Sequence, residues 1–347
     1  MVSRTSSRDR AVATRRRGTL RQVTGVVAAG ILLVIGVVLS VFVGSGDISA
    51  SEVISALTGD GNTTTDLLVR DFRIPRTVLA VLVGLALGLA GVVMQAITRN
   101  PLADPGILGV NAGAYFAVVV GTAVFSVGAG LGQMLLAILG AAITAVVVYF
   151  ISSRGQAAGT VVKLVLAGVA IGAVLLGFSQ AITLTQPDVF DRVRFWALGS
   201  LQGRQWSTVE IVWLAIVLAA VLVVLLARSL NALTMGEDVA RALGTNVALV
   251  RALSFVAITV LCGAATAAAG PLTFVGLVVP FVARFVVGVD HRWIVAFAVL
   301  AGPALVVLSD VLGRVVISSE LPVGVVTAFL GAPVMIALVR RTQLRSL

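Results

Sequence analysis

The stretch Thr77-Val-Leu-Ala-Val-Leu-Val-Gly-Leu-Ala-Leu-Gly-Leu-Ala-Gly-Val-Val-Met-Gln-Ala-Ile97 contains no charged side chain. It begins directly after Arg76 and ends two residues before Arg99. A helix of this length rises about 30 Å, at about 1.5 Å per residue, which matches the hydrocarbon core of a bilayer. The stretch therefore predicts a transmembrane helix.

Nine further apolar runs of similar length follow or precede this one. Hydrophobic residues make up 59% of the 347 residues and charged residues only 12%, more apolar surface than a soluble core of this size can hide. We therefore predict an all-α membrane protein with ten transmembrane helices in one domain, residues 23–339. The predicted spans are 23–44, 77–97, 106–125, 131–151, 163–183, 209–227, 250–269, 273–289, 293–312 and 322–339.

The basic residues predict the orientation of these spans. With a cytoplasmic amino terminus, 18 of the 25 Lys and Arg residues fall on the cytoplasmic side and 7 on the external side. The positive-inside rule favours this orientation. It makes the chain a multi-pass protein of the cell membrane with a cytoplasmic arm, 1–22, and a cytoplasmic tail, 340–347. The net charge of +10 thus reflects membrane topology and contact with lipid, and nucleic acid is not an expected partner.

The arginine-rich arm has more than one interpretation. We interpret Arg15, Arg16 and Arg17 as anchors of the first span, because the apolar run behind them is long and lacks a small-residue cleavage site. A twin-arginine signal or a lipid-binding arm remains an alternative.

Small residues recur in the second span. Gly84, Gly88 and Gly91 lie at helical spacing, and such residues let helix backbones approach closely in a membrane. We expect them to pack helices within the bundle. A seam between two subunits is the alternative.

The sequence lacks the residues that several classes of activity require. A nucleotide-binding P-loop needs Gly-Lys-Ser/Thr, yet the only lysine, Lys163, stands between Val162 and Leu164. The only histidine, His291, has no second histidine or cysteine nearby to form a metal site. Ion-coupled carriers usually bury ionisable groups. Here the spans hold almost none. The exceptions are Arg284, which we expect to snorkel to the surface, and Asp310, which we expect to pair with Arg314 one turn away.

Two polar segments predict short helices outside the membrane. In the external segment 45–76, Ser49 and Glu52 form a potential capping box. In the cytoplasmic segment 228–251, the stretch Gly236-Glu-Asp-Val-Ala-Arg-Ala-Leu-Gly244 has acidic residues at its start and a glycine at its end. A helix of this kind on the membrane surface is suited to contact a cytoplasmic partner.

A set of motifs along nearly the whole chain resembles the FecCD-type permeases, the family of importers for vitamin B12, ferric siderophores and haem. The motifs are Arg73-Ile-Pro-Arg76, Met94-Gln-Ala96, Arg99-Asn-Pro-Leu-Ala-Asp-Pro-Gly-Ile-Leu-Gly109, the segment 236–244, Gly270-Pro-Leu-Thr-Phe-Val-Gly-Leu277 and Leu321-Pro-Val-Gly-Val-Val-Thr-Ala-Phe-Leu-Gly-Ala-Pro333.

The resemblance implies an ATP-binding-cassette importer whose permease chain is not itself an enzyme. It implies a second permease subunit, identical or paralogous, two cytoplasmic ATPase subunits that bind ATP and Mg, and an external binding protein. This chain would bind no cofactor or metal of its own. We expect an iron-siderophore as the substrate, with cobalamin or haem as alternatives. An ion-coupled secondary transporter is the rival class.

The resemblance also assigns roles to residues. It implies that Arg73, Arg76 and Arg314 dock the binding protein, and the predicted topology places all three outside. It implies that the ATPase subunits grip a coupling helix formed by Gly236, Glu237, Ala240, Arg241, Leu243 and Gly244. Thr327, Gly331 and Pro333 of the last span are expected to line the passage.

Overall fold

A computed structural model describes residues 4–44, 48–59, 63–128, 130–152, 161–317 and 320–343. These residues form helices and their connections, and none of them forms a strand. The elements are α1 (Arg4–Phe42), α2 (Ala50–Thr58), α3 (Thr64–Leu67), the π-helix η1 (Leu68–Arg73), α4 (Ile74–Thr98), the 3₁₀ helix η2 (Pro105–Leu108), α5 (Val110–Phe125), α6 (Leu131–Ser152), α7 (Val161–Thr185), α8 (Pro187–Ala197), α9 (Trp206–Thr234), α10 (Glu237–Ala242), α11 (Val247–Ala269), α12 (Val275–Val287), α13 (His291–Val316) and α14 (Val323–Gln343).

The long apolar helices agree with the predicted spans. Seven stretches of the described residues, in α1, α4, α6, α7, α9, α11 and α13, are long and apolar enough to cross a membrane. Shorter apolar helices, Val110–Phe125, Val275–Val287 and Val323–Ala337, coincide with the other predicted spans. At about 1.5 Å per residue these are short for a crossing of about 30 Å. The all-helical membrane fold is confirmed, and the count of ten crossings stays a prediction.

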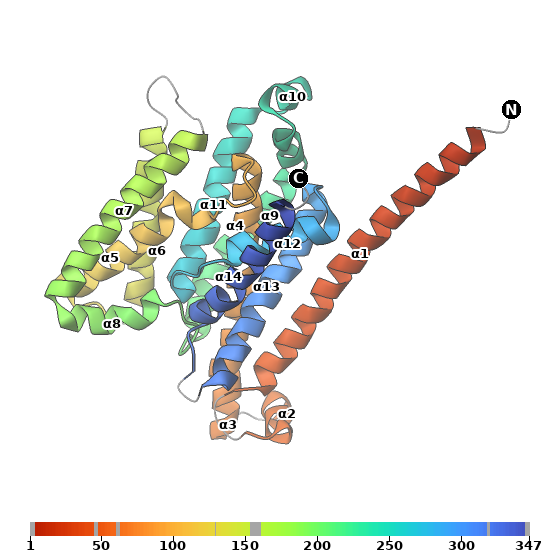
Figure 1. Cartoon of the computed structure of the whole chain (residues 1–347). Helices are drawn as coiled ribbons and strands as arrows, with labels where there is room; N and C mark the ends of the chain where they lie inside the picture. Colours follow the sequence, from red (N-terminus) through yellow and green to blue (C-terminus); the bar gives the residue numbers. More distant parts are fainter. Residues whose placement is uncertain are drawn as a thin grey trace.

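Helix α4, which contains the stretch 77–97, is the centre of the bundle. Every residue from Ala86 to Ile97 is buried, as expected for a helix that is apolar on all sides. It packs against α9, α11, α12 and α13. Figure 1 shows α1 on one side of this centre and α5, α6, α7 and α8 on the other.

The glycines of α4 let neighbouring backbones touch. A Cβ atom at Gly91 would lie 1.8 Å from the carbonyl oxygen of Gly276 in α12, and one at Gly84 would lie 2.4 Å from that of Gly302 in α13. Gly88 also faces α13, at 3.3 Å from the carbonyl oxygen of Ala298. The predicted packing within the bundle is confirmed for these residues.

We expect Gly91→Ala to destabilise the fold severely, because the new methyl group must push two backbones apart. Overpacking of a core typically costs about 1–3 kcal/mol, and a backbone obstacle leaves less room for relief. Gly177→Ala in α7 is the matched control, since no described atom beyond its own stretch of helix lies within 4 Å of its Cβ position. The yield of monodisperse protein in detergent measures the effect. Equal yields for the two variants would contradict this packing.

The two ends of the bundle carry different short helices. In Figure 1, α10 and the first turns of α1 lie toward one end, and α2, α3 and α8 lie at the opposite end. We call these the α10 end and the α8 end. This arrangement agrees with the predicted topology, in which the α10 end is cytoplasmic and the α8 end external.

Local structure differs from the sequence prediction in three places. Helix α1 begins at Arg4, so most of the predicted arm 1–22 continues the first span as one helix. Helix α9 extends to Thr234, so the start of the polar segment predicted at 228–251 belongs to this long helix. Helix α8 was not predicted, although Pro187 at its start and Asp188 in its first turn are typical helix-start residues. The capping box of Ser49 and Glu52 at the start of α2 is confirmed.

Candidate functional site

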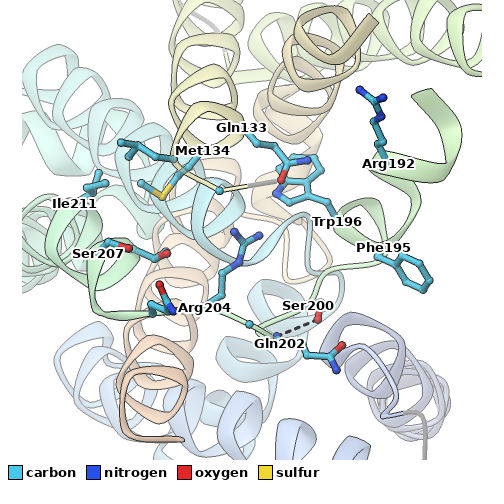
Figure 2. Close-up of a pocket in the computed structure, with 15 residues that line it drawn as sticks. Gln133, Met134, Arg192, Phe195, Trp196, Ser200, Gln202, Arg204, Ser207 and Ile211 are labelled. Atoms are coloured by element: carbon cyan, nitrogen blue, oxygen red, sulfur yellow. Dashed lines mark hydrogen bonds between the residues drawn. The ribbon is translucent and has the colours of Figure 1, made fainter. Parts of the chain in front are cut away.

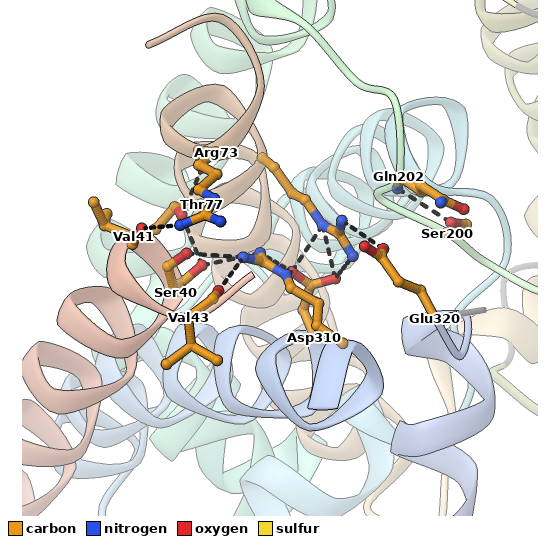
Figure 3. A network of polar contacts seen from close by, with 11 residues as sticks. Ser40, Val41, Val43, Arg73, Thr77, Ser200, Gln202, Asp310 and Glu320 are labelled. Carbon is orange, nitrogen blue, oxygen red and sulfur yellow. Dashed lines mark hydrogen bonds and ion pairs between the residues drawn. The ribbon is translucent and has the colours of Figure 1, made fainter. Parts of the chain in front are cut away.

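Two hollows open at the α8 end. The larger, of about 450 Å³, lies among α6, α8, the loop 198–205 and α9 (Figure 2). The smaller, of about 190 Å³, is lined by Arg73, Arg76, Arg314 and Glu320. Figure 3 shows the polar network at this second hollow. The predicted docking residues therefore lie together, around one opening.

Arg76, in the first turn of α4, holds two carboxylates. Its Nε and Nη2 atoms donate to both oxygens of Asp310 in α13, at 2.9–3.1 Å. Its Nη1 atom donates to Glu320 at 2.9 Å. The planar guanidinium suits such a bidentate pair. Asp310 is 1% exposed and Arg76 is 13% exposed, so the carboxylate is buried at this end of the bundle while the guanidinium borders the hollow.

Arg314 and Arg73 bind the end of α1. Arg314 donates to the carbonyl oxygens of Ser40 at 2.8 Å and Val43 at 3.1 Å, and it also pairs with Asp310. Arg73 donates to the carbonyl oxygens of Val41 and Phe42 at 3.2 and 3.3 Å. The last carbonyls of a helix lack intrahelical partners and carry partial negative charge, so cations stabilise them. The two arginines thus tie α1 to η1 and α13.

The arginine cluster, Arg73, Arg76 and Arg314 with their two carboxylates, differs from the sequence expectation in one respect. The predicted pair of Asp310 and Arg314 is present. The arginines are, however, not free surface charges, because Arg73 is 8% and Arg314 is 7% exposed. Their docking role stays a prediction. Three guanidinium groups face two carboxylates, so the cluster keeps one unit of positive charge.

At the opposite end, α10 forms the helix predicted within 236–244. Gly236 precedes it with φ +124° and Gly244 follows it with φ +79°, backbone conformations that favour glycine. Glu237 pairs with Arg241 at 3.3 Å and also with Arg251 of α11. The pair with Arg241 lies within α10, and the pair with Arg251 fixes α10 to the next transmembrane helix.

The surface of α10 is partly apolar. Ala240 is fully buried and anchors the helix, whereas Leu243 is 65% and Val239 is 43% exposed. Met235, two residues before the helix, is 69% exposed. Exposed apolar side chains beside charged ones are typical of a protein contact surface.

Known proteins share the sequence pattern of this chain. The model of the FecCD transport family matches residues 32–341. This chain belongs to that family. The ferric enterobactin transport system permease protein FepD of Escherichia coli (strain K12) is 47% identical over 311 residues, which cover 90% of this chain and 93% of the relative. The probable siderophore transport system permease protein YfiZ of Bacillus subtilis (strain 168) is 38% identical, with 89% and 93% covered.

A solved structure shares the fold. A metal-chelate type ABC transporter in an inward-facing conformation superposes with a TM-score of 0.80 at 26% identity, covering 91% of this chain and 98% of that chain. Other family members are named for hemin and cobalamin import. The family and the apolar helices together make this chain a multi-pass protein of the inner membrane.

The three residues expected to line the translocation passage lie on α14, and they differ in exposure. Thr327 is 1% exposed and its hydroxyl donates to the carbonyl oxygen of Gly324. Gly331 is buried against Phe274, since a methyl group on Gly331 would lie 2.5 Å from the Cβ atom of Phe274. Pro333 alone of the three is exposed. In this conformation Thr327 and Gly331 therefore face their own chain, and the exposed surface of α14 carries Phe329, at 77% exposure.

Arg284 in α12 also differs from expectation. The sequence predicts that it snorkels to the surface. Instead its Nη1 atom donates to the side-chain oxygen of Gln95 in α4, at 2.5 Å, and Gln95 donates in turn to the carbonyl oxygen of Leu277. Gln95 is 1% exposed at the centre of the fold. It therefore gives Arg284 a polar partner inside the bundle in place of water.

Proposed function

We propose that this chain is the membrane-spanning subunit of an ATP-binding-cassette importer that carries a ferric siderophore into the cytoplasm. The observation that carries the proposal is the 47% identity to the ferric enterobactin permease over nearly both chains. The relatives named for hemin and cobalamin are 36% and 35% identical, so haem and cobalamin are the weaker alternatives.

In this proposal the chain performs no chemistry. Partner ATPase subunits bind ATP and Mg, and α10 receives their motion. The exposed side chains of Val239 and Leu243 and the charged side chain of Arg241 supply the contact surface. A second permease subunit, identical or paralogous, would cover part of α7 and α14, whose apolar side chains include the exposed Phe178 and Phe329.

Helix α4 gives a physical connection between the two ends. Arg76 in its first turn belongs to the arginine cluster. Arg99, directly after its last turn, donates from Nε to the carbonyl oxygen of Leu233 at 2.9 Å. Leu233 lies near the end of α9, shortly before α10. A movement of α10 can therefore reach the arginine cluster through one rigid, buried helix.

The arginine cluster is the proposed landing site of the external binding protein. Its residual positive charge and its hollow suit an acidic side chain of that protein. Charge complementarity of this kind speeds encounter and fixes orientation. Because Arg73 and Arg314 hold the end of α1, charge reversal there would disturb the fold as well as docking. Arg76, at 13% exposure, is the better residue to test.

We expect Arg76→Gln to weaken binding of the loaded binding protein about tenfold, equivalent to about 1.4 kcal/mol. Glutamine keeps a donor for Asp310 but removes the charge. Arg194→Gln is the control, since Arg194 lies on α8 at the same end and is exposed, paired with Asp191 of its own helix. Binding of the purified binding protein to the detergent-solubilised chain measures the effect. An unchanged dissociation constant for Arg76→Gln, with protein that elutes normally, would refute docking at this cluster.

A further inference from the structure

The larger hollow at the α8 end is lined by hydrogen-bond donors and has no acidic side chain. Its volume is about 450 Å³. Figure 2 shows Arg204 near the middle of the labelled side chains, with Gln133 and Trp196 next to each other beyond it. The lining residues are Gly130, Leu131, Gln133, Met134, Arg192, Phe195, Trp196, Ser200, Gln202, Gly203, Arg204, Gln205, Ser207, Thr208 and Ile211.

Arg204 is a cation without a counter-charge in the part of the chain that the structure describes. No side chain or carbonyl among these residues accepts a hydrogen bond from its guanidinium or pairs with it. Burial lowers the pKa of this guanidinium from its usual range. Arg204 is half-buried, so its charge is partly removed from water without a partner, and a bound anion would stabilise it.

Trp196 adds a second donor without an acceptor. The side chain is 5% exposed, and its Nε1–H group has no hydrogen-bond partner among the described residues. The indole is held in place by stacking on Tyr115 of α5, with ring centroids 6.4 Å apart and planes at 8°. Gln133, at 3% exposure, lies beside it. A buried indole N–H normally finds a partner, and Trp196 lines the hollow, so a ligand acceptor bound there would supply the missing partner.

The surroundings of the hollow are those of a membrane surface. It lies at the first turns of α6 and α9, where two apolar helices begin. Among its lining residues, Leu131 is 57%, Phe195 is 61% and Ile211 is 36% exposed. Exposed apolar side chains next to polar ones match the acyl chains and headgroup of a lipid.

We propose that this hollow binds the phosphate group of a phospholipid headgroup, with Arg204 as its cation and Gln133 and Trp196 as neutral donors. Because the lining offers no carboxylate to a headgroup ammonium, the site prefers phosphatidylglycerol to phosphatidylethanolamine. The hydroxyls of Ser200, Ser207 and Thr208 are available to the glycerol headgroup. Free inorganic phosphate offers the same anionic oxygens as the phosphate of a lipid headgroup, and the experiment distinguishes these two ligands. The proposal does not depend on the transported substrate.

The test uses the full-length chain in detergent, delipidated and then titrated with phosphatidylglycerol or phosphatidylethanolamine. Native mass spectrometry counts the retained lipid. We expect retention of phosphatidylglycerol by the unaltered chain to fall about tenfold in Arg204→Gln, to survive in large part in Arg204→Lys, and to be unchanged in Arg194→Gln. The melting temperature of each variant without lipid shows whether it is folded.

Each outcome decides the proposal. Selective loss of phosphatidylglycerol in a folded Arg204→Gln variant supports it. Equal retention by Arg204→Gln and the unaltered chain overturns it. If millimolar inorganic phosphate displaces the lipid and alone raises the melting temperature as much as the lipid does, the lipid assignment is overturned and the hollow is a site for free phosphate. If Arg204→Gln does not fold, Gln133→Leu takes its place: loss of phosphatidylglycerol retention by this folded variant supports the proposal, and retention equal to that of the unaltered chain overturns it.

Discussion

Replacement of Asp310 by alanine is expected to destabilise the protein by about 3–5 kcal/mol, the usual cost of breaking a buried ion pair from one side. Asp310 is 1% exposed and accepts from both Arg76 and Arg314. Its removal leaves the buried guanidinium of Arg314 without a carboxylate and leaves Arg76 with Glu320 alone. It also loosens the hold of Arg314 on the end of α1. The melting temperature of the detergent-solubilised protein should fall by about 5–10 °C.

Two controls separate this network from ordinary ion pairs. Asp310→Asn keeps an oxygen acceptor and should lose less stability than alanine. Asp191→Ala breaks the pair with Arg194, whose side chains are 47% and 61% exposed for arginine and aspartate, and should change stability by less than about 1 kcal/mol. Similar small shifts for Asp310→Ala and Asp191→Ala would contradict a structural role for the arginine cluster.

The second large effect is expected at α10. Replacing both Glu237 and Arg241 by alanine should reduce substrate uptake at least tenfold, while ATP hydrolysis by the partner subunits continues. Glu237 ties α10 to Arg251 of α11, and Arg241 is 62% exposed at the proposed ATPase contact. Without them, motion of the ATPase subunits no longer moves the transmembrane helices. Uptake and hydrolysis measured in the same proteoliposomes check the result.

Neighbouring residues provide the controls for α10. Asp238 lies in the same turn but is 99% exposed, and Asp238→Ala should transport normally. Arg251→Ala removes the same ion pair from the α11 side and should reproduce part of the defect. Normal uptake by the double variant of Glu237 and Arg241 would exclude α10 as the coupling helix.

Hydropathy and charge predicted the membrane fold because charge-free runs such as 77–97 have only one stable environment. The same rules placed Arg73, Arg76 and Arg314 at one end of the bundle. They did not predict the burial of these arginines, since this burial depends on the end of α1 packing against η1 and α13. Contacts between segments this far apart in sequence leave no local pattern.

Other features were missed for related reasons. Glu320 pairs with Arg76 across 244 positions of sequence, a tertiary contact without a local signal. From the sequence, Arg204 was predicted only to be a basic residue on the external side. The hollow beside it forms where α6, α8 and α9 meet, and this is a tertiary arrangement. Helix α8 did have a signal in Pro187 and Asp188, within the segment between the predicted spans 163–183 and 209–227.

The most direct test of the importer proposal is uptake of a ferric siderophore into proteoliposomes that contain this chain with its cognate ATPase subunits, with loaded binding protein on the external side. The account predicts uptake that requires enclosed ATP and Mg, stops with vanadate and continues with a protonophore. Uptake driven by a proton gradient without ATP, and abolished by the protonophore, would contradict it and favour an ion-coupled carrier.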